Sequence, residues 1–287
     1  MNVFSSAGFL LVACLLAIAP PVSYGQEGCS LTEVDSLTVR TCLYGDGETT
    51  VILAAGAGQT SASWSPMIPL LSSSFRVMTF DRAGLGGSDQ GPTPRSPTRI
   101  AQELRRTLDV LQMESPFVLV GHSMGGVHML SFAEQFPEAV RAVVLLDTPP
   151  PGFEEERRTL LTAAEREARD RLLEDGLSRL PEAVALEREG ALPITEWEFP
   201  DFDRNIPVFV IAADSQNFGP QGSQERHQAL WLRESRHWAS LSDYGHFEVA
   251  EGSGHMVHHD RSAQVAAFIR SAYSRFLKLP NFQRISP

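Results

Sequence analysis

The sequence predicts an α/β domain built on a mainly parallel, doubly wound sheet. The chain has 287 residues, enough for one large domain with a substantial core. From about residue 36, short apolar stretches alternate with amphipathic helical ones, the pattern of strand–helix units around a parallel sheet. The middle stretches are continuously apolar, as expected for strands that helices cover on both faces. The expected strands are residues 37–43, 50–55, 76–80, 117–120, 140–146, 206–213 and 247–250.

Charge and cysteine content exclude several classes of function. The net charge is −11, with one lysine, Lys278, against 23 arginines, so we expect no basic surface for nucleic acid. The three cysteines include no Cys-x-x-Cys pair, and we therefore expect no zinc site. No repeat of 20–50 residues is present, which argues against a solenoid.

The N-terminus predicts export. Residues 7–19 form an apolar run of 13 residues, shorter than the roughly 20 that a membrane span needs. The run fits the core of a signal peptide over residues 1–25, with cleavage before Gln26, so the protein is expected to be secreted or periplasmic. The first six residues lack Lys and Arg, which leaves an uncleaved or buried helix as an alternative. Residues 11–14 resemble a lipoprotein box, but apolar sequence continues past Cys14, so anchoring there is less favoured.

The expected export also predicts the state of the two remaining cysteines. Removing the signal peptide leaves Cys29 and Cys42, which in an oxidising compartment are expected to pair. Closing a loop of this length stabilises a protein by about 3 kcal/mol in the chain-entropy picture. Two buried free thiols are the alternative.

One segment breaks the alternation of strands and helices. Residues 148–206 contain no strand-like run, and we expect two helices there. The segment has 15 acidic and 8 basic residues, a net charge of −7. Glu154, Glu155 and Glu156 suit the amino end of a helix, where carboxylates are favoured. We interpret the segment as a helical cap over the carboxyl edge of the sheet, with a solvated surface excursion as the alternative. If the cap overhangs the site, its negative field disfavours anionic substrates.

The most specific motif lies at residues 121–125, Gly-His-Ser-Met-Gly, which fits G-x-S-x-G. It follows the apolar stretch 117–120 and precedes a helical stretch, residues 127–136, as a nucleophile elbow requires. The glycines leave room for a tight strand-to-helix turn. Such a turn raises the Ser123 hydroxyl above the sheet, near a helix amino end that stabilises a developing oxyanion.

With this motif the chain resembles the α/β-hydrolase family. Residues 55–58, Ala-Gly-Ala-Gly, resemble its H-G-x-G oxyanion loop, and residues 81–88 resemble its D-x-x-G-x-G-x-S turn. Residues 251–255 resemble the late G-x-G-H segment that carries the histidine. The resemblance runs from about residue 37 to 277 and leaves the cap uncovered.

The resemblance implies an architecture and an oxyanion hole. The core would comprise residues 26–147 and 207–287, with the helical cap, residues 148–206, inserted after the stretch 140–146, the sixth strand of an α/β-hydrolase sheet. The oxyanion donors would be the backbone N–H groups of Ala57 and Met124. Ala55 stands where the family usually has histidine, but the donors belong to the backbone, so this departure need not remove the hole.

His255 is the expected general base. It follows a strand and two glycines and precedes a helical stretch, residues 262–276, so it lies on a loop at the carboxyl edge of the sheet. His122 lies inside the elbow, where the family has a packing histidine. His246 precedes its strand, at the wrong edge, and His258 and His259 begin the next helix, where we expect exposed or structural roles.

Two residues are candidates for the acid that orients this base. Asp147 follows the stretch 140–146 and resembles the acid of dehalogenase-like members. Asp214 follows the stretch 206–213, but the family's usual acid lies about two residues later, where Gln216 and Asn217 carry no charge. We favour Asp147 and keep Asp214 as the alternative.

The expected function is that of a secreted serine hydrolase that cleaves small carboxylic esters through an acyl-enzyme on Ser123, without metal or organic cofactor. A cofactor-free peroxidase or a carbon–carbon bond hydrolase would use the same catalytic triad. A ligand-binding protein on a hydrolase scaffold is the non-enzymatic alternative. Dehalogenases and epoxide hydrolases of the family need Asp in place of Ser123. The sequence indicates neither the acyl length nor the oligomeric state.

Overall fold

The structure, a computed structural model, describes residues 28–191 and 199–276. Its strands form one eight-stranded sheet in the order β1-β2-β4-β3-β5-β6-β7-β8. From β4 through β8 every neighbouring pair is parallel, whereas β1–β2 and β2–β4 are antiparallel. The expected mainly parallel sheet is therefore confirmed. The strands are β1 (Cys29–Val34), β2 (Leu37–Tyr44), β3 (Thr50–Ala54), β4 (Arg76–Phe80), β5 (Phe117–His122), β6 (Val140–Leu146), β7 (Val208–Ala213) and β8 (His246–Ala250).

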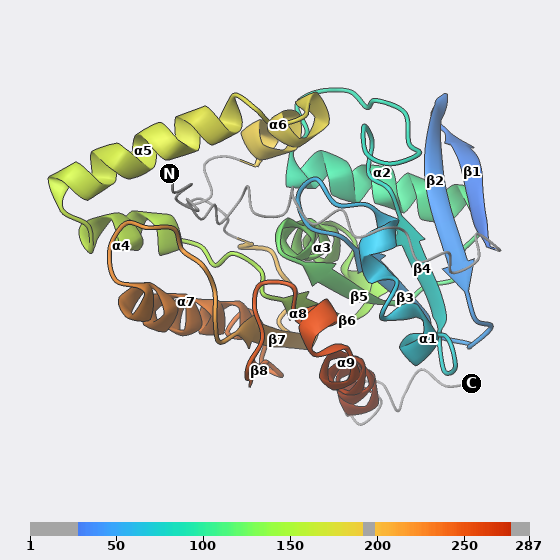
Figure 1. The fold of residues 1–287 in the computed structure, drawn as a ribbon. Helices are drawn as coiled ribbons and strands as arrows, with labels where there is room; N and C mark the ends of the chain where they lie inside the picture. The colour runs from blue at the N-terminus through green and yellow to red at the C-terminus, as the bar shows by residue number, and fades with distance from the viewer. Residues whose placement is uncertain (1–27, 192–198, 277–287) are drawn as a thin grey trace.

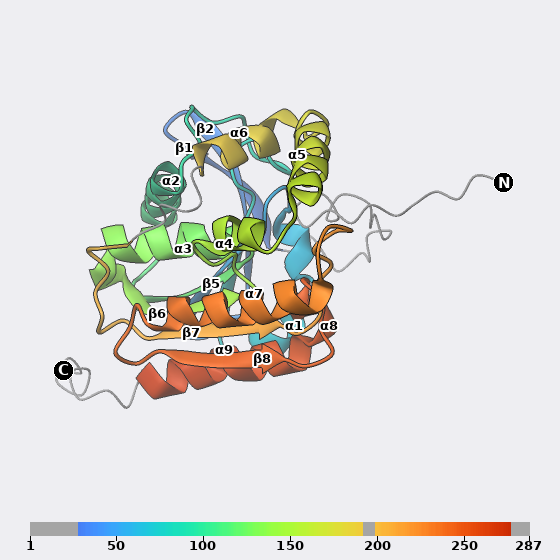
Figure 2. The same cartoon turned by 90° about the vertical axis from the view of Figure 1, so that its left-hand side faces the viewer.

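Helices cover both faces of the sheet (Figures 1 and 2). One apolar layer joins β-strand residues to α2 (Pro97–Val110), α3 (Met124–Gln135) and α7 (Gln224–Ala239). The other layer joins the sheet to α1 (Ile68–Leu71) and α9 (Ser262–Phe276). Every residue of β3, β5 and β7 is buried, which explains their continuous apolar sequence. The short helices are η2 (Ser61–Trp64), η3 (Pro137–Ala139) and α8 (Val257–Asp260).

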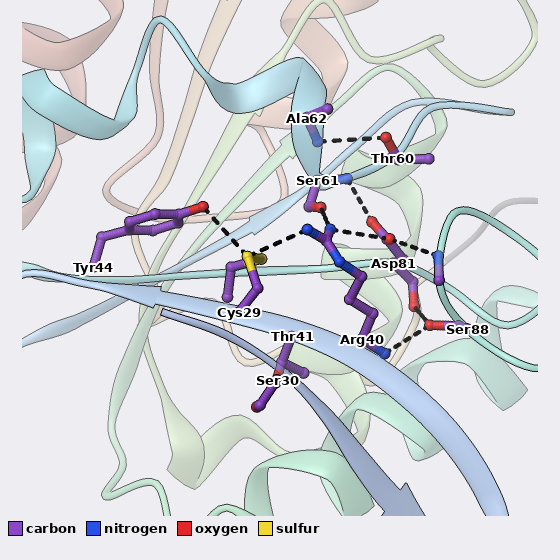
Figure 3. Close-up of a disulfide and its surroundings, with 12 residues drawn as sticks. Cys29, Ser30, Arg40, Thr41, Tyr44, Thr60, Ser61, Ala62, Asp81 and Ser88 are labelled. Atoms are coloured by element: carbon purple, nitrogen blue, oxygen red, sulfur yellow. Dashed lines mark hydrogen bonds and ion pairs between the residues drawn. A yellow bond between two sulfur atoms is a disulfide. The ribbon is translucent and has the colours of Figure 1, made fainter. Parts of the chain in front are cut away.

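The antiparallel edge contains a strand that the sequence pattern did not predict. β1 pairs with β2 so that Cys29 lies opposite Cys42, and the two form a disulfide bond (Figure 3). The favoured pairing of these cysteines is thus present in the structure. Leu31 of β1 is 66% exposed, so the strand lacks the buried face that would have revealed it.

The turn after β4 is organised by its own motif residues. Asp81 accepts hydrogen bonds from the backbone N–H groups of Ser61 and Gly87. Ser88 donates its hydroxyl to the Asp81 carbonyl, and Arg40 of β2 contacts the Asp81 carboxylate (Figure 3). These contacts explain the motif: its Asp and Ser hold the turn against the amino-terminal half of β2 and against the segment that begins at Ser61.

The expected insertion between β6 and β7 is helical, but the number of helices was underestimated. The part that the structure describes contains three, not two: α4 (Phe153–Thr159), α5 (Ala163–Leu177) and α6 (Glu182–Gly190). Thr162 and Glu165 form a capping box that starts α5, and Pro181 precedes α6. The expected carboxylates occupy the first turn of α4.

The charge of the cap lies mainly at its exposed positions. Eight of the acidic residues in the described part of the cap are exposed: Glu155, Glu167, Asp170, Glu174, Asp175, Glu182, Glu189 and Asp201. Its buried charged residues are Arg157, Arg169 and Glu187. That the negative field of the cap disfavours anionic substrates stays a prediction.

The expected signal peptide, its cleavage before Gln26 and the lipoprotein box at Cys14 lie outside the described residues. Across 28–191 and 199–276, no helix is long and apolar enough to cross a membrane.

Candidate active site

Ser123 occupies a strained turn between β5 and α3. Its backbone has φ 51° and ψ −128°, a combination that residues other than glycine rarely adopt. A Cβ on Gly121 would lie 2.4 Å from the Gly126 backbone, and one on Gly125 would lie 2.2 Å from the Ala54 carbonyl oxygen. The turn therefore requires glycine at both motif positions, as the sequence motif predicted. The elbow leaves Ser123 only 6% exposed.

His255 and Asp147 are 108 positions apart in the sequence but lie side by side in the structure. His255 lies on the loop between β8 and α8, and its Nδ1 is 2.6 Å from Oδ2 of Asp147. Asp147 directly follows β6 and has a positive φ of 46°. The aspartate side chain is fully buried, and that of His255 is 22% exposed. This is the arrangement of a carboxylate that orients an imidazole.

Three further donors hold the Asp147 carboxylate. Oδ1 accepts from the Ala213 backbone N–H at 2.9 Å and from the Trp231 indole N–H at 2.8 Å. Oδ2 accepts from the Gln216 side-chain amide at 2.7 Å. Gln216 lies in the region in which the resemblance places the usual acid, and here its side-chain amide donates to Asp147, which follows the neighbouring strand β6.

Asp214, the alternative acid, has a different position. Its carboxylate accepts the backbone N–H groups of Gly252 at 2.7 Å and Ser253 at 3.1 Å. In the described part of the chain, no hydrogen bond or ion pair joins it to His255. Asp214 therefore anchors the loop that carries the histidine.

His122 connects the elbow to two other loops. Its Nε2 lies 2.8 Å from the His255 carbonyl oxygen, and its Nδ1 lies 3.2 Å from Oε1 of Gln59. The same Gln59 oxygen accepts the Gly56 backbone N–H at 3.1 Å. Burial, and then the neighbouring His258, hold the pKa of His122 well below its ordinary value, so the ring is neutral. A neutral ring has a single N–H and both facing oxygens are acceptors, so His122 donates a hydrogen bond to one of the two loops and packs against the other.

Of the three other histidines weighed in the sequence, His258 and His259 lie near His122, and His246 begins β8 at the opposite edge of the sheet. His258 is fully buried against the rings of Trp64 and His122. His259 contacts the Ser63 carbonyl oxygen, and His246 pairs with Glu248. These positions agree with structural roles for all three histidines.

The two expected oxyanion donors are unengaged. Within the described residues, the backbone N–H groups of Ala57 and Met124 donate no hydrogen bond. Met124 is the first residue of α3, where a backbone N–H has no partner inside the helix. Both groups therefore remain able to bind an oxygen of a ligand.

The sequence analysis did not predict the contacts that Gln59, Gln216 and Trp231 make in this site. Trp231 lies 84 positions from the carboxylate that it contacts, and no local pattern distinguishes it from a core tryptophan. Across the described residues, no group of three or more His, Cys, Asp or Glu side chains is placed to hold a metal ion.

Comparison with known proteins agrees with this geometry. Residues 49–189 match the family model described as the alpha/beta hydrolase fold. The match covers just under half of the chain, and the resemblance to the α/β-hydrolase family inferred from its motifs is confirmed.

Curated relatives match over about a third of the chain. A putative carbamate hydrolase, RutD of Azorhizobium caulinodans, is 34% identical over 105 residues, 37% of this chain and 39% of the relative. A probable transporter, efuK of Hormonema carpetanum, is 33% identical over 106 residues, which are 36% of this chain and 15% of the relative. The chain thus spans less than half the length of these relatives.

Solved structures match over most of the chain. A thermophilic esterase from Thermogutta terrifontis superposes with a TM-score of 0.62 at 20% identity, covering 86% of this chain and 98% of the esterase. An enol-lactonase from Burkholderia xenovorans also gives a TM-score of 0.62, at 15% identity, covering 85% of this chain and 100% of the lactonase. At these identities the likeness establishes the fold.

Proposed function

We propose that this α/β hydrolase is an exported serine hydrolase that cleaves small carboxylic esters through an acyl-enzyme on Ser123. The observation that carries the proposal is the buried Asp147 carboxylate, 2.6 Å from Nδ1 of His255, beside a strained serine elbow. A carboxylate at Nδ1 keeps the proton on that nitrogen and leaves Nε2 free to accept another. The pair therefore suits a general base for a serine nucleophile.

In the first half-reaction, Ser123 Oγ bonds to the ester carbonyl carbon while its proton passes to Nε2 of His255. The carbonyl oxygen becomes an oxyanion that accepts the N–H groups of Ala57 and Met124. The tetrahedral intermediate then collapses, the C–O bond to the alcohol breaks, and His255 returns the proton to the leaving oxygen. Asp147 stabilises the imidazolium form throughout.

In the second half-reaction, water gives its proton to His255 and attacks the acyl carbon, and Ser123 leaves with the proton that His255 returns. The described structure shows no hydrogen bond between Ser123 and His255. Proton transfer requires Oγ and Nε2 to approach to about 2.6–3.2 Å, and catalytic contacts commonly tighten to this range when substrate binds.

Several observations support this choice over the alternatives. An esterase and an enol-lactonase, both of which act on C–O acyl bonds, share the fold. A bromoperoxidase from Bacillus anthracis shares it too, with a TM-score of 0.61, so a cofactor-free peroxidase on the same residues is the second candidate. The disulfide between Cys29 and Cys42 supports export, because such bonds persist in oxidising compartments.

A panel of p-nitrophenyl esters with graded acyl lengths tests the proposal. We expect saturable hydrolysis with a clear optimum of kcat/KM in acyl length. Peroxide-dependent oxidation without ester hydrolysis would favour the peroxidase. Saturable ester binding without turnover would instead identify a binding protein on a hydrolase scaffold.

A further inference from the structure

A buried ion pair joins the cap to the loop that precedes the oxyanion donor. Arg82 follows β4, and Glu187 lies on α6 of the cap. Arg82 Nε donates to Oε1 of Glu187 at 2.7 Å, and Nη2 donates to Oε2 at 2.9 Å. The two side chains are 1% and 2% exposed. The guanidinium fork and the carboxylate thus make a bidentate contact out of water.

The same guanidinium holds two backbone carbonyls. Its Nη1 donates to the Ala55 carbonyl oxygen at 2.6 Å, and its Nη2 donates to the Gly56 carbonyl oxygen at 2.9 Å. The Gly56 carbonyl and the Ala57 N–H belong to one planar peptide unit and point in opposite directions. Fixing the carbonyl oxygen on Arg82 therefore fixes the direction of the Ala57 N–H. A cation at the carbonyl end also polarises the peptide and strengthens its N–H as a donor.

Helix α6 packs directly against this loop. A Cβ on Gly58 would lie 3.1 Å from Val184, and one on Gly84 would lie 2.7 Å from Ala183. Val184 and Ala183 form a small buried apolar cluster with Leu85. The contact between cap and core is therefore close in the turn of α6 that precedes Glu187, and movement of α6 would be transmitted to the loop.

Among the charged groups near the pair, Glu187 is the carboxylate that neutralises the charge of Arg82. Arg95, the other buried cation nearby, pairs with Glu103 at 2.6 Å. Burial, and then the positive charge of Arg82, lower the pKa of His128 to about 3, so this neighbour is neutral. Burial opposes ionisation of Glu187, but Arg82 outweighs it and holds the pKa of that carboxyl below its ordinary value.

We propose that Glu187 is a positioning residue that, through Arg82, holds the 55–57 backbone so that the Ala57 N–H faces the oxyanion. The cap thereby completes the oxyanion hole. A contribution to folding stability does not by itself explain a buried ion pair, because the cost of desolvating the two charges offsets much of their attraction. The inference rests on the proposed ester hydrolysis by Ser123.

The test compares Glu187→Gln with Glu189→Gln, an exposed position on the same helix. Glutamine keeps the shape of Glu187 but offers Arg82 one acceptor instead of two. We measure kcat per active site, counted by complete fluorophosphonate labelling, together with KM and the affinity for phenylboronic acid, which binds serine as a tetrahedral adduct. Removing an oxyanion donor outright costs about 10²–10³ in kcat.

We expect Glu187→Gln to lower kcat per site at least tenfold, with KM changed less than threefold and boronate affinity reduced in proportion to kcat. Glu189→Gln should match the wild type. If Glu187→Gln does not fold, Glu187→Asp decides, because it keeps the charge but is too short to span the same contact.

A kcat per site within twofold of wild type in the folded variant, with unchanged boronate affinity, would overturn the positioning role even if the melting temperature fell. Failure of the proposed function is a separate result, since it would appear in the wild type as absent ester turnover and absent labelling.

Discussion

Replacing Asp147 with Asn removes the charge of the proposed acid while keeping its shape. The hydrogen-bond donors around residue 147 determine the orientation of the asparagine amide. The donors on Oδ1, the Ala213 N–H and the Trp231 indole N–H, cannot become acceptors, so the asparagine oxygen has to remain there. Its NH₂ group must then face Nδ1 of His255, which now has to accept a hydrogen bond. The imidazole proton moves to Nε2, and the ring can no longer take the Ser123 proton.

The expected loss follows from this tautomer. Asparagine in place of the buried aspartate of a serine triad lowers kcat by about 10⁴, equivalent to about 5.4 kcal/mol of transition-state stabilisation. We therefore expect a loss of about 10³–10⁴ for Asp147→Asn. The matched control is Asp214→Asn, which keeps one acceptor for the Gly252–Ser253 turn, and for which we expect a loss within about tenfold.

The assay is kcat on the best ester of the panel at neutral pH, with folding of both variants checked by circular dichroism and thermal unfolding. Two results would refute the reasoning. One is an Asp147→Asn variant that retains a tenth of the wild-type kcat. The other is the reverse ranking, with Asp214→Asn the more damaging change.

Two further predictions concern stability. His128 is fully buried, neither ring nitrogen has a partner among the described residues, and its pKa is lowered to about 3. Below about pH 6.5 the unfolded chain takes up a proton at this histidine, whereas the folded chain does not. The free energy of unfolding should therefore fall, through this residue, by up to about 1.4 kcal/mol per pH unit as the pH is lowered from about 6 to 4. His128→Leu should remove that slope in urea titrations at several pH values, and an unchanged slope would show that the ring protonates in the folded state. Reducing the Cys29–Cys42 disulfide should lower the free energy of unfolding by about 3 kcal/mol, and equal denaturation midpoints with and without reductant would contradict its stabilising role.

The sequence predicted those elements whose signal is local. The expected helix over residues 262–276 coincides with α9 (Ser262–Phe276), and the elbow motif has the strand, turn and helix that its glycines require. β1 was missed because a short exposed edge strand has no buried alternation, and its pairing with β2 decides its conformation.

The long-range contacts of the site could not be predicted in this way. Glu187 and Arg82 are separated by 105 positions, and nothing in the acidic pattern of the cap distinguishes this buried carboxylate from its exposed neighbours. The choice between Asp147 and Asp214 remained open for a related reason. Each aspartate directly follows a buried strand, and only the packed loops show which carboxylate contacts His255.

The central claim is that Ser123 is a nucleophile activated by His255, and the rate of covalent labelling by a fluorophosphonate tests it most directly. We expect the wild-type protein to form one adduct, mapped by mass spectrometry to Ser123, and Ser123→Ala to form none while remaining folded. His255→Ala should label at least a hundredfold more slowly, because the hydroxyl then lacks its base. Absence of an adduct on the wild-type protein, under conditions that fully label a known serine esterase, would contradict the account.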